Sequence, residues 1–273
     1  MSVIPPTTTA SAPTTPAAPG KRTFATRYRL MRSRWNEEWW SVAMGGPIGN
    51  VINALIGDLA WVTPNRITLA GFVAKLAAVP ALVGGGPGAL IAAAILLQVS
   101  VICDCMDGSL ARYRKRPSAL GAYLDKVTDA IGYTAVFGAF GWRVHHDTGD
   151  ATALVLAFAI PATLLIRGYV YWVVAALEKQ AGADASTGID KRTDFSTATL
   201  GERASMYVRS MPRVIQFAES DLFFWLGLAL VLGEPWMQRA LYLLGFATGC
   251  WFIGILVRRT LRVLELDRRK TKP

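Results

Sequence analysis

Four aspartates and a short basic loop occur together in one segment of the chain, DCMDGSLARYRKRPSALGAYLDKVTD, residues 104–129. Asp104 and Asp107 are three residues apart, and Asp125 and Asp129 are four apart, so each pair shares one face of a helix. A short connection between two helices makes them antiparallel neighbours, which would bring the two acidic faces together. We therefore predict that four carboxylates converge on one small volume.

Carboxylates gathered in this way are stable only where positive charge balances them, because they repel one another and are costly to desolvate. Oxygen ligands without histidine or cysteine favour a hard cation such as Mg²⁺, Mn²⁺ or Ca²⁺. Two such ions about 3.5–4 Å apart are the arrangement that clamps a phosphoryl group during a displacement reaction. The aspartates therefore predict a site for two divalent ions that acts on phosphate.

Small residues lie beside the aspartates on the same predicted helix faces, namely Gly108, Ala111 and Gly121. Each would let a ligand come close to the helix backbone next to a carboxylate. Glycine and alanine in membrane helices also serve close helix packing, which is the more common reason for any one of them. Their coincidence with the aspartates favours a ligand-binding role for the group.

The composition is that of a membrane protein. Of 273 residues, 52% are hydrophobic and 18% are charged, and the mean hydropathy is +0.33. A helix that crosses hydrocarbon needs about 20 mostly apolar residues. We expect an all-α integral membrane protein with six transmembrane helices and an amino-terminal juxtamembrane amphipathic helix. The expected spans are 67–84, 88–110, 119–142, 151–176, 221–234 and 237–257.

The chain divides into one membrane domain and flanking segments. Residues 1–20 carry no charge and are rich in Pro, Thr, Ser and Ala, which predicts a disordered tail. Residues 21–60 mix arginines with aromatic residues, so we expect a cytoplasmic juxtamembrane helical segment that lies on lipid or packs on the protein. We assign 61–262 to the six-helix catalytic domain and 263–273 to a basic cytoplasmic tail. The polar connection 181–213 is long for a loop, so we expect a cap or a partly helical excursion.

Positive charge determines the expected orientation. Most of the 29 Lys and Arg fall on the side of the membrane that carries both termini and the loop around Arg114, and such residues favour the cytoplasm. The site is then expected to face the cytoplasm from the cytoplasmic or inner membrane, with His145 and His146 on the far side. Because topology and anionic membrane lipid account for the net charge of +10, nucleic acid is not expected as a partner. Neither a disulfide framework nor a zinc site is implied by the three cysteines, Cys103, Cys105 and Cys250.

The acidic segment resembles the signature of the class I CDP-alcohol phosphotransferase family. All eight defined positions are filled, in the order Asp104-x-x-Asp107-Gly108-x-x-Ala111-Arg112, eight residues, Gly121-x-x-x-Asp125-x-x-x-Asp129. The expected six-span architecture also resembles the family, and TPNRITLAG at 63–71 is similar to the segment that opens its first membrane helix. The resemblance implies transfer of a substituted phosphate from a CDP-linked donor to an alcohol, with release of CMP and with two Mg²⁺ or Mn²⁺ ions.

The resemblance also implies a role for each signature residue. The metal ions would be held by Asp104, Asp107, Asp125 and Asp129. Asp129 would in addition be the catalytic base that takes the proton of the incoming hydroxyl. The nucleotide would be bound by Gly108, Ala111, Arg112 and Gly121. Arg112 has a structural alternative, in which its guanidinium reaches to the lipid headgroups.

The substrates are less closely defined than the chemistry. A site in the membrane favours CDP-diacylglycerol as donor, and a water-soluble CDP-alcohol with a lipid or polyol acceptor is the alternative. The fourth span reads LLIRGYVYWVVAALEK and acidic residues at 219–221 enter the fifth, which departs from family members that act on glycerol phosphate or inositol phosphate. Arg167 in the fourth span either binds an anionic part of a substrate or pairs with another group in the membrane, such as one of the aspartates. For Lys75 and Lys126 we expect packing or a reach to the membrane surface.

Two other functions are compatible with an acidic site in a membrane protein. A membrane prenyltransferase also holds a diphosphate with Mg²⁺ on paired aspartate-rich helices, but the short chain and the Gly108-x-x-Ala111-Arg112 spacing argue against it. A divalent-cation transporter would use the carboxylates as a filter, yet all four lie at one membrane boundary. We therefore expect an enzyme whose partners are a CDP-linked donor, a small alcohol acceptor and membrane lipids, with a homodimer left open.

Overall fold

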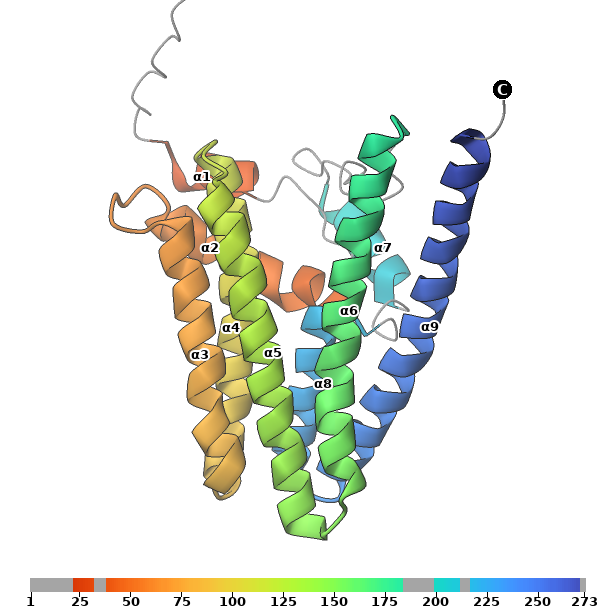
Figure 1. Cartoon of the computed structure of the whole chain (residues 1–273). Coiled ribbons are helices and arrows are strands. Elements are labelled where there is room, and N and C mark those ends of the chain that lie inside the picture. The colour runs from red at the N-terminus through yellow and green to blue at the C-terminus, as the bar shows by residue number, and fades with distance from the viewer. Residues whose placement is uncertain (1–21, 32–37, 184–198, 212–216, 271–273) are drawn as a thin grey trace, which may run out of the picture.

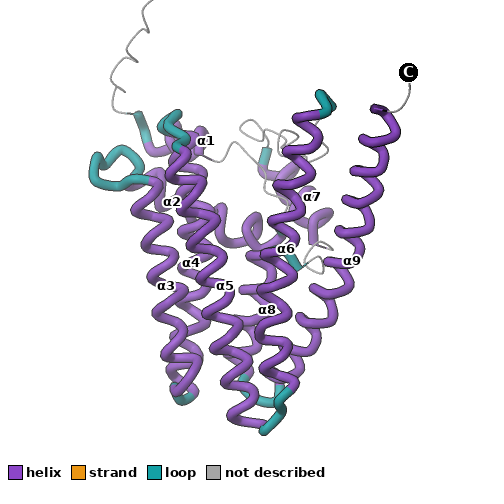
Figure 2. The backbone as a smooth tube through the Cα atoms, viewed as in Figure 1, coloured by secondary structure: helices purple, strands orange, loops and turns teal. Residues whose placement is uncertain are grey.

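The structure is a computed structural model that describes residues 22–31, 38–183, 199–211 and 217–270, in which every regular element is a helix (Figures 1 and 2). In chain order these are α1 (Phe24–Met31), the π-helical turn η1 (Ser41–Gly45), α2 (Gly46–Ile56), α3 (Pro64–Gly84), α4 (Pro87–Tyr113), α5 (Ala119–Thr148), α6 (Thr152–Gln180), α7 (Leu200–Ser210), α8 (Glu219–Leu232) and α9 (Trp236–Lys270). The expected all-α class is confirmed for the described part of the chain.

Six of the described helices form a bundle: α3, α4, α5, α6, α8 and α9 (Figure 1). Short connections at residues 85–86, 149–151 and 233–235 join them as three antiparallel pairs at one end of the bundle. α3 packs against α4 and α5, α5 against α6, α6 against α9, and α8 against α4. The short helices α1, α2 and α7 lie at the opposite end, where α6 and α9 spread apart (Figure 1). That end also holds the acidic segment, because α4 finishes and α5 begins there.

Capping residues determine where two of the helices that carry the site begin. Thr63 caps α3, since its Oγ1 accepts a hydrogen bond from the N–H of Arg66 at 3.3 Å, and Pro64 occupies the first turn. Ser118 caps α5 by accepting from the N–H of Gly121 at 3.0 Å. Both caps lie at the end of the bundle that carries the aspartates, so the chain enters each helix in a defined direction there.

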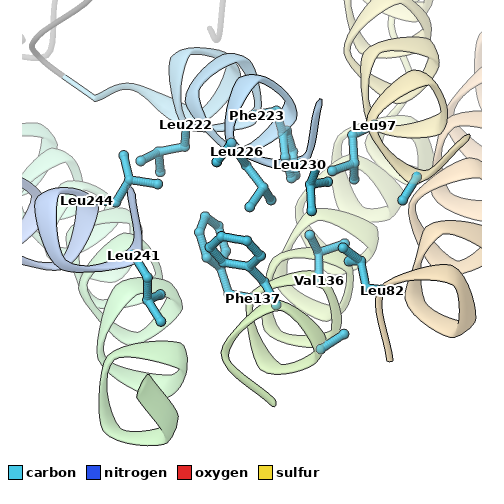
Figure 3. Close-up of a cluster of buried hydrophobic side chains, with 14 of the residues drawn as sticks. Leu82, Leu97, Val136, Phe137, Leu222, Phe223, Leu226, Leu230, Leu241 and Leu244 are labelled. Atoms are coloured by element: carbon cyan, nitrogen blue, oxygen red, sulfur yellow. The ribbon is translucent and has the colours of Figure 1, made fainter. Parts of the chain in front are cut away.

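The centre of the bundle is an apolar core that includes α5 (Figure 3). Val136 and Phe137 of α5 are fully buried. They belong to one cluster with Leu82 of α3, Leu97 of α4, Leu222, Leu226 and Leu230 of α8, and Leu241 and Leu244 of α9. Close packing of these side chains favours one rotation of α5 over others, and that rotation determines which way its acidic residues face.

Helices occupy all six ranges in which membrane spans are expected, and four of them are long and apolar enough to cross a membrane. Within the described residues these four are α3, α4, α6 and α9. α5 has 30 residues but carries charged side chains near both ends. α8 has 14 residues and is about 21 Å long at 1.5 Å per residue, less than the ~30 Å of a hydrocarbon core. The chain is an integral membrane protein, and the count of six spans stays a prediction.

The expected juxtamembrane segment 21–60 is helical over most of its described part, as α1, η1 and α2. α1 packs on α2, and α2 packs on α4. Met31 at the end of α1 is buried, and Arg27 forms an ion pair with Asp58 at 2.8 Å. These contacts agree with a segment that packs on the protein, and a position on the lipid surface stays a prediction.

Three further expectations concern the flanks and the long connection. The tail predicted at 1–20 lies outside the described residues, as do residues 271–273. α9 continues to Lys270, so the basic tail expected at 263–273 is helical over its described part. The described part of the connection 181–213 includes α7, which agrees with a helical excursion.

The fold generates a prediction about topology. Lys115 lies in the connection between α4 and α5, and His146 lies at the other end of α5, which has 30 residues and is about 45 Å long. We expect Lys115→Cys to react with an impermeant thiol reagent from the cytoplasmic side and His146→Cys from the other side, in a variant whose native cysteines are replaced by alanine. Labelling of both positions from one side would contradict the membrane arrangement.

Candidate active site

The acidic stripes of α4 and α5 meet at the end of the bundle that carries α1, α2 and α7. Asp104 of α4 and Asp125 and Asp129 of α5 each offer one carboxylate oxygen, and these three atoms lie within 4.8 Å of one another. Asp104 is exposed, Asp125 is half-buried, and Asp129 is 7% exposed. The prediction that both helices direct carboxylates into one small volume is therefore confirmed for three of the four aspartates.

Asp107 lies one turn after Asp104 on α4, but its carboxylate bonds a residue of α3. Its Oδ2 accepts a hydrogen bond from the hydroxyl of Thr68 on α3 at 2.5 Å, and the residue is 9% exposed. Asp107 is not part of the group of three oxygens, and its described side-chain partner lies on α3. Thr68, which stands in the TPNRITLAG segment, was not predicted from the sequence as a site residue.

A large cavity opens beside the aspartates. Its volume is about 1,060 Å³, at the upper end of the range for small-molecule sites. The lining includes all eight positions of the sequence signature, namely Asp104, Asp107, Gly108, Ala111, Arg112, Gly121, Asp125 and Asp129. Other parts of the lining come from α1, η1, α2, the start of α3, α7 and Glu219 at the start of α8. The fold thus gathers the whole signature around one space.

The two signature glycines leave room for particular neighbours. A Cβ atom on Gly108 would lie 3.1 Å from Nη1 of Arg112, so the absence of a side chain lets the guanidinium fold back along α4. A Cβ atom on Gly121 would lie 3.0 Å from Asn65 Oδ1 and 3.0 Å from Ser118 Oγ. Gly121 therefore permits the first turn of α5 to approach the first turn of α3, which is a role in helix packing.

The ion pair between Lys75 and Asp129 is a feature of the site that helical spacing alone did not predict. Lys75 of α3 is 5% exposed, and its Nζ lies 2.5 Å from Asp129 Oδ1. Packing, one of the two expectations for this lysine, agrees with its burial against α5, and the other, a reach to the membrane surface, is wrong because its Nζ bonds Asp129. A signal was present in the helical spacing, since Lys75 lies seven residues after Thr68 and both belong to the buried face of α3.

Lys126 lies at the mouth of the same cavity. Its Nζ is 3.0 Å from Asp125 Oδ2, and its side chain is 58% exposed. The residue is among those that line the cavity. An exposed pair of this kind contributes at most about 1 kcal/mol to stability, so the contact with Asp125 adds little to the stability of the fold.

Arg167 pairs with Glu219, which lines the cavity, and is itself outside the residues that line it. Its Nη2 lies 3.4 Å from Glu219 Oε1, and the hydroxyl of Tyr133 donates to Glu219 Oε2 at 2.8 Å. Of the two alternatives weighed for Arg167, the described contacts agree with an ion pair inside the bundle. The partner is Glu219 and not one of the four aspartates.

Glu38 adds a further acidic group to the lining, from the segment before η1. Burial raises the pKa of its carboxyl above the usual value, and the nearby Glu219 carboxylate raises that pKa further. Hydrogen bonding to Ser220, whose backbone N–H lies 3.3 Å from Glu38 Oε2, acts in the opposite direction. The side of the cavity formed by η1 and α8 is therefore polar and acidic.

Comparison with known proteins identifies the family. The sequence model of the CDP-alcohol phosphatidyltransferase family matches residues 61–251, which is more than half of the chain. The matched range contains every signature position named above. The chain therefore belongs to the CDP-alcohol phosphatidyltransferase family, as the resemblance of its acidic segment indicated.

Individual relatives share part of the chain. An archaetidylinositol phosphate synthase from Methanothermobacter thermautotrophicus is 34% identical over 139 residues, which cover 51% of this chain and 65% of the relative. A phosphatidylinositol phosphate synthase from Mycolicibacterium smegmatis is 31% identical over 135 residues, covering 50% of this chain and 58% of the relative. The crystal structure of Mycobacterium tuberculosis phosphatidylinositol phosphate synthase with CDP-DAG bound is similar with a TM-score of 0.45 and 20% identity, over 80% of this chain and 94% of that one.

The donor set fits a hard divalent ion, and this predicts the metal affinity of variants. Three carboxylate oxygens within 4.8 Å, without nitrogen or sulfur in the group, suit Mg²⁺ or Mn²⁺. We expect Asp104→Asn to weaken Mn²⁺ binding, measured by titration calorimetry, by at least the ~10- to 100-fold that follows loss of an outer metal partner. Asp150→Asn is the matched control, because Asp150 bonds Gln238 and Tyr242 at the far end of the bundle. Equal Mn²⁺ affinities of the two variants would contradict a metal site at the aspartates.

Proposed function

We propose that the protein transfers a substituted phosphate from CDP-diacylglycerol to the hydroxyl of a small alcohol and releases CMP, as a step of phospholipid biosynthesis. The observation that carries this proposal is the meeting of Asp104, Asp125 and Asp129 within 4.8 Å on the wall of a cavity of about 1,060 Å³. Membership of the CDP-alcohol phosphatidyltransferase family supports the reaction type. The names of the relatives, which include phosphatidylinositol phosphate synthases, make inositol phosphate an acceptor to test alongside uncharged alcohols.

Two Mg²⁺ or Mn²⁺ ions would be held by Asp104, Asp125 and Asp129, with Asp107 as the fourth ligand. When bound, the ions would neutralise the donor diphosphate and the charge that develops on the departing CMP. Arg112 adds a fixed positive charge on the same wall, where it would pair with a donor phosphate. The nucleotide could lie against the helix backbone because the residues there have small side chains or none, namely Gly108, Ala111 and Gly121.

Asp129 would act as the general base. In the transfer, the acceptor oxygen forms a bond to the phosphorus that carries the lipid, the bond from that phosphorus to the CMP oxygen breaks, and the hydroxyl proton passes to Asp129. An alcohol is a weak nucleophile near neutral pH, so a carboxylate placed beside it contributes about 10²- to 10⁴-fold. CMP leaves with the electron pair of the broken bond.

The orientation of the protein belongs to the same proposal. The cavity lies at the end of the bundle from which the basic connection between α4 and α5 and the basic carboxyl end of α9 project (Figure 1). Positive residues favour the cytoplasmic side, so the cavity would open toward the cytoplasm, where the alcohol and CMP are soluble. Six spans formed by α3, α4, α5, α6, α8 and α9 within residues 61–262 would complete the catalytic domain.

The reaction is tested by product release. Purified protein in lipid is incubated with Mn²⁺, CDP-diacylglycerol and one alcohol at a time, drawn from serine, glycerol phosphate, inositol and inositol phosphate. We expect CMP release that depends on one alcohol, that stops when a chelator removes the metal, and that returns when Mg²⁺ or Mn²⁺ is added. CMP release that persists after thorough chelation would contradict the metal-dependent mechanism.

The roles of the aspartates are separated by kinetics. We expect Asp129→Asn to slow the chemical step by about 10²- to 10⁴-fold at saturating donor, because the substitution removes the base. Asp104→Asn is expected to weaken donor binding and turnover together, because it removes a metal ligand. Single-turnover rates and donor affinities measured side by side decide the matter. A wild-type single-turnover rate for Asp129→Asn at saturating donor would show that Asp129 is not the base.

A further inference from the structure

We propose that Lys75 is a positioning residue for Asp129: it holds one carboxylate oxygen so that the carboxylate presents only its other oxygen to the reacting groups. This inference rests on the proposed function, in which Asp129 is the base. The lysine does not line the cavity, whereas Asp129 does. Lys75 would therefore act on the reaction through Asp129 and without touching either substrate.

The contact between the two residues is short and enclosed. Lys75 Nζ lies 2.5 Å from Asp129 Oδ1, and the two side chains are 7% and 10% exposed. A charged lysine in a membrane helix is costly unless it is paired, and Asp129 is the partner that the described residues provide. The pair is consequently a persistent feature of the site and not an occasional surface contact.

Helix α5 is shaped to admit this lysine. Gly132 lies three residues after Asp129, and a Cβ atom there would be 2.7 Å from Cδ of Lys75. Tyr133 follows Gly132, and its ring centroid is 4.9 Å from Lys75 Nζ, a distance at which a cation is attracted to the ring face. The ring of Phe223 on α8 is 5.9 Å away. A slot in α5 and two rings therefore restrict where the ammonium group can lie.

Restriction of the ammonium group restricts the carboxylate in turn. A free carboxylate can turn and bind a divalent ion with both oxygens, as acidic ligands often do. With Oδ1 bonded to Lys75, Asp129 can offer the cavity one oxygen, which must then serve the acceptor hydroxyl and any ion beside it. Lys75 thus prevents Asp129 from becoming a two-oxygen metal ligand and keeps it available as a base.

Removal of Lys75 should therefore move metal affinity and turnover in opposite directions. Lys75→Met keeps the length of the side chain and removes the charge, so Asp129 becomes free to bind metal and a repelling cation is lost. We expect tighter Mn²⁺ binding by calorimetry together with a fall of about 10²-fold in the single-turnover rate, the scale of a misplaced catalytic group. Lys179→Met on the exposed end of α6 is the matched control and should change neither quantity.

A double-mutant cycle tests whether Lys75 acts through Asp129. We expect Lys75→Met combined with Asp129→Asn to be no slower than Asp129→Asn alone, because no base is left to position. This neutral pair also avoids a lone buried charge, so it covers the case in which Lys75→Met does not fold. Gly132→Ala, which keeps the lysine but crowds its stem, should slow the wild type and leave Asp129→Asn unchanged.

Several results would overturn the inference. Rate losses that multiply in the cycle would mean that Lys75 acts independently of Asp129. A raised donor KM with unchanged kcat would make it a substrate-binding residue, and a lowered melting temperature with wild-type kcat would make the pair structural. The measurement of Mn²⁺ affinity does not depend on the proposed reaction. If the wild type releases no CMP with any alcohol, the proposed function fails. If Lys75→Met binds Mn²⁺ as tightly as the wild type or less tightly, the positioning of Asp129 by Lys75 is contradicted.

Discussion

The repulsion among carboxylates at the end of a membrane bundle is the constraint on which the rest of the site depends. Asp104, Asp125 and Asp129 lie within 4.8 Å of one another, and such a group is stable only beside compensating positive charge. The described residues supply part of that charge through Lys75 and Lys126, which bond Asp129 and Asp125. Divalent ions would supply the remainder, and the same charge is what a diphosphate donor needs in order to bind.

The bundle resists this repulsion by apolar packing further along the same helices. Phe137 lies two turns beyond Asp129 on α5 and is fully buried in a cluster that joins α3, α4, α5, α6, α8 and α9 (Figure 3). Helix α5 therefore carries the acidic residues near its start and residues of the apolar cluster further along. A helix held in this way cannot rotate to separate its carboxylates from Asp104, so the energy of packing maintains an arrangement that electrostatics alone would disperse.

Helical spacing explains how much of the site could be predicted from the sequence. The spacing of the aspartates and the short basic connection were sufficient to predict that Asp104, Asp125 and Asp129 meet, because a helix places residues three or four apart on one face. The all-α class and the six helical ranges followed from runs of apolar residues in the same direct way.

Contacts between helices that are distant in sequence could not be predicted in this manner. The partners of Asp107, Asp129 and Arg167 are Thr68, Lys75 and Glu219, and each depends on how one helix is rotated against another. That rotation is decided by the fit of many side chains and not by the spacing within one helix. The bond from Lys75 to Asp129 was not predicted for this reason, since an isolated lysine in an apolar span equally suits a reach to the membrane surface.

The location of divalent ions tests the central claim most directly. Crystals of the protein grown in lipid and soaked with Mn²⁺ can be measured at the manganese absorption edge, where an anomalous difference map shows the metal alone. We expect two Mn²⁺ peaks about 3.5–4 Å apart between Asp104 of α4 and Asp125 of α5. A map without manganese at these aspartates, from a protein that releases CMP under the same conditions, would contradict that claim.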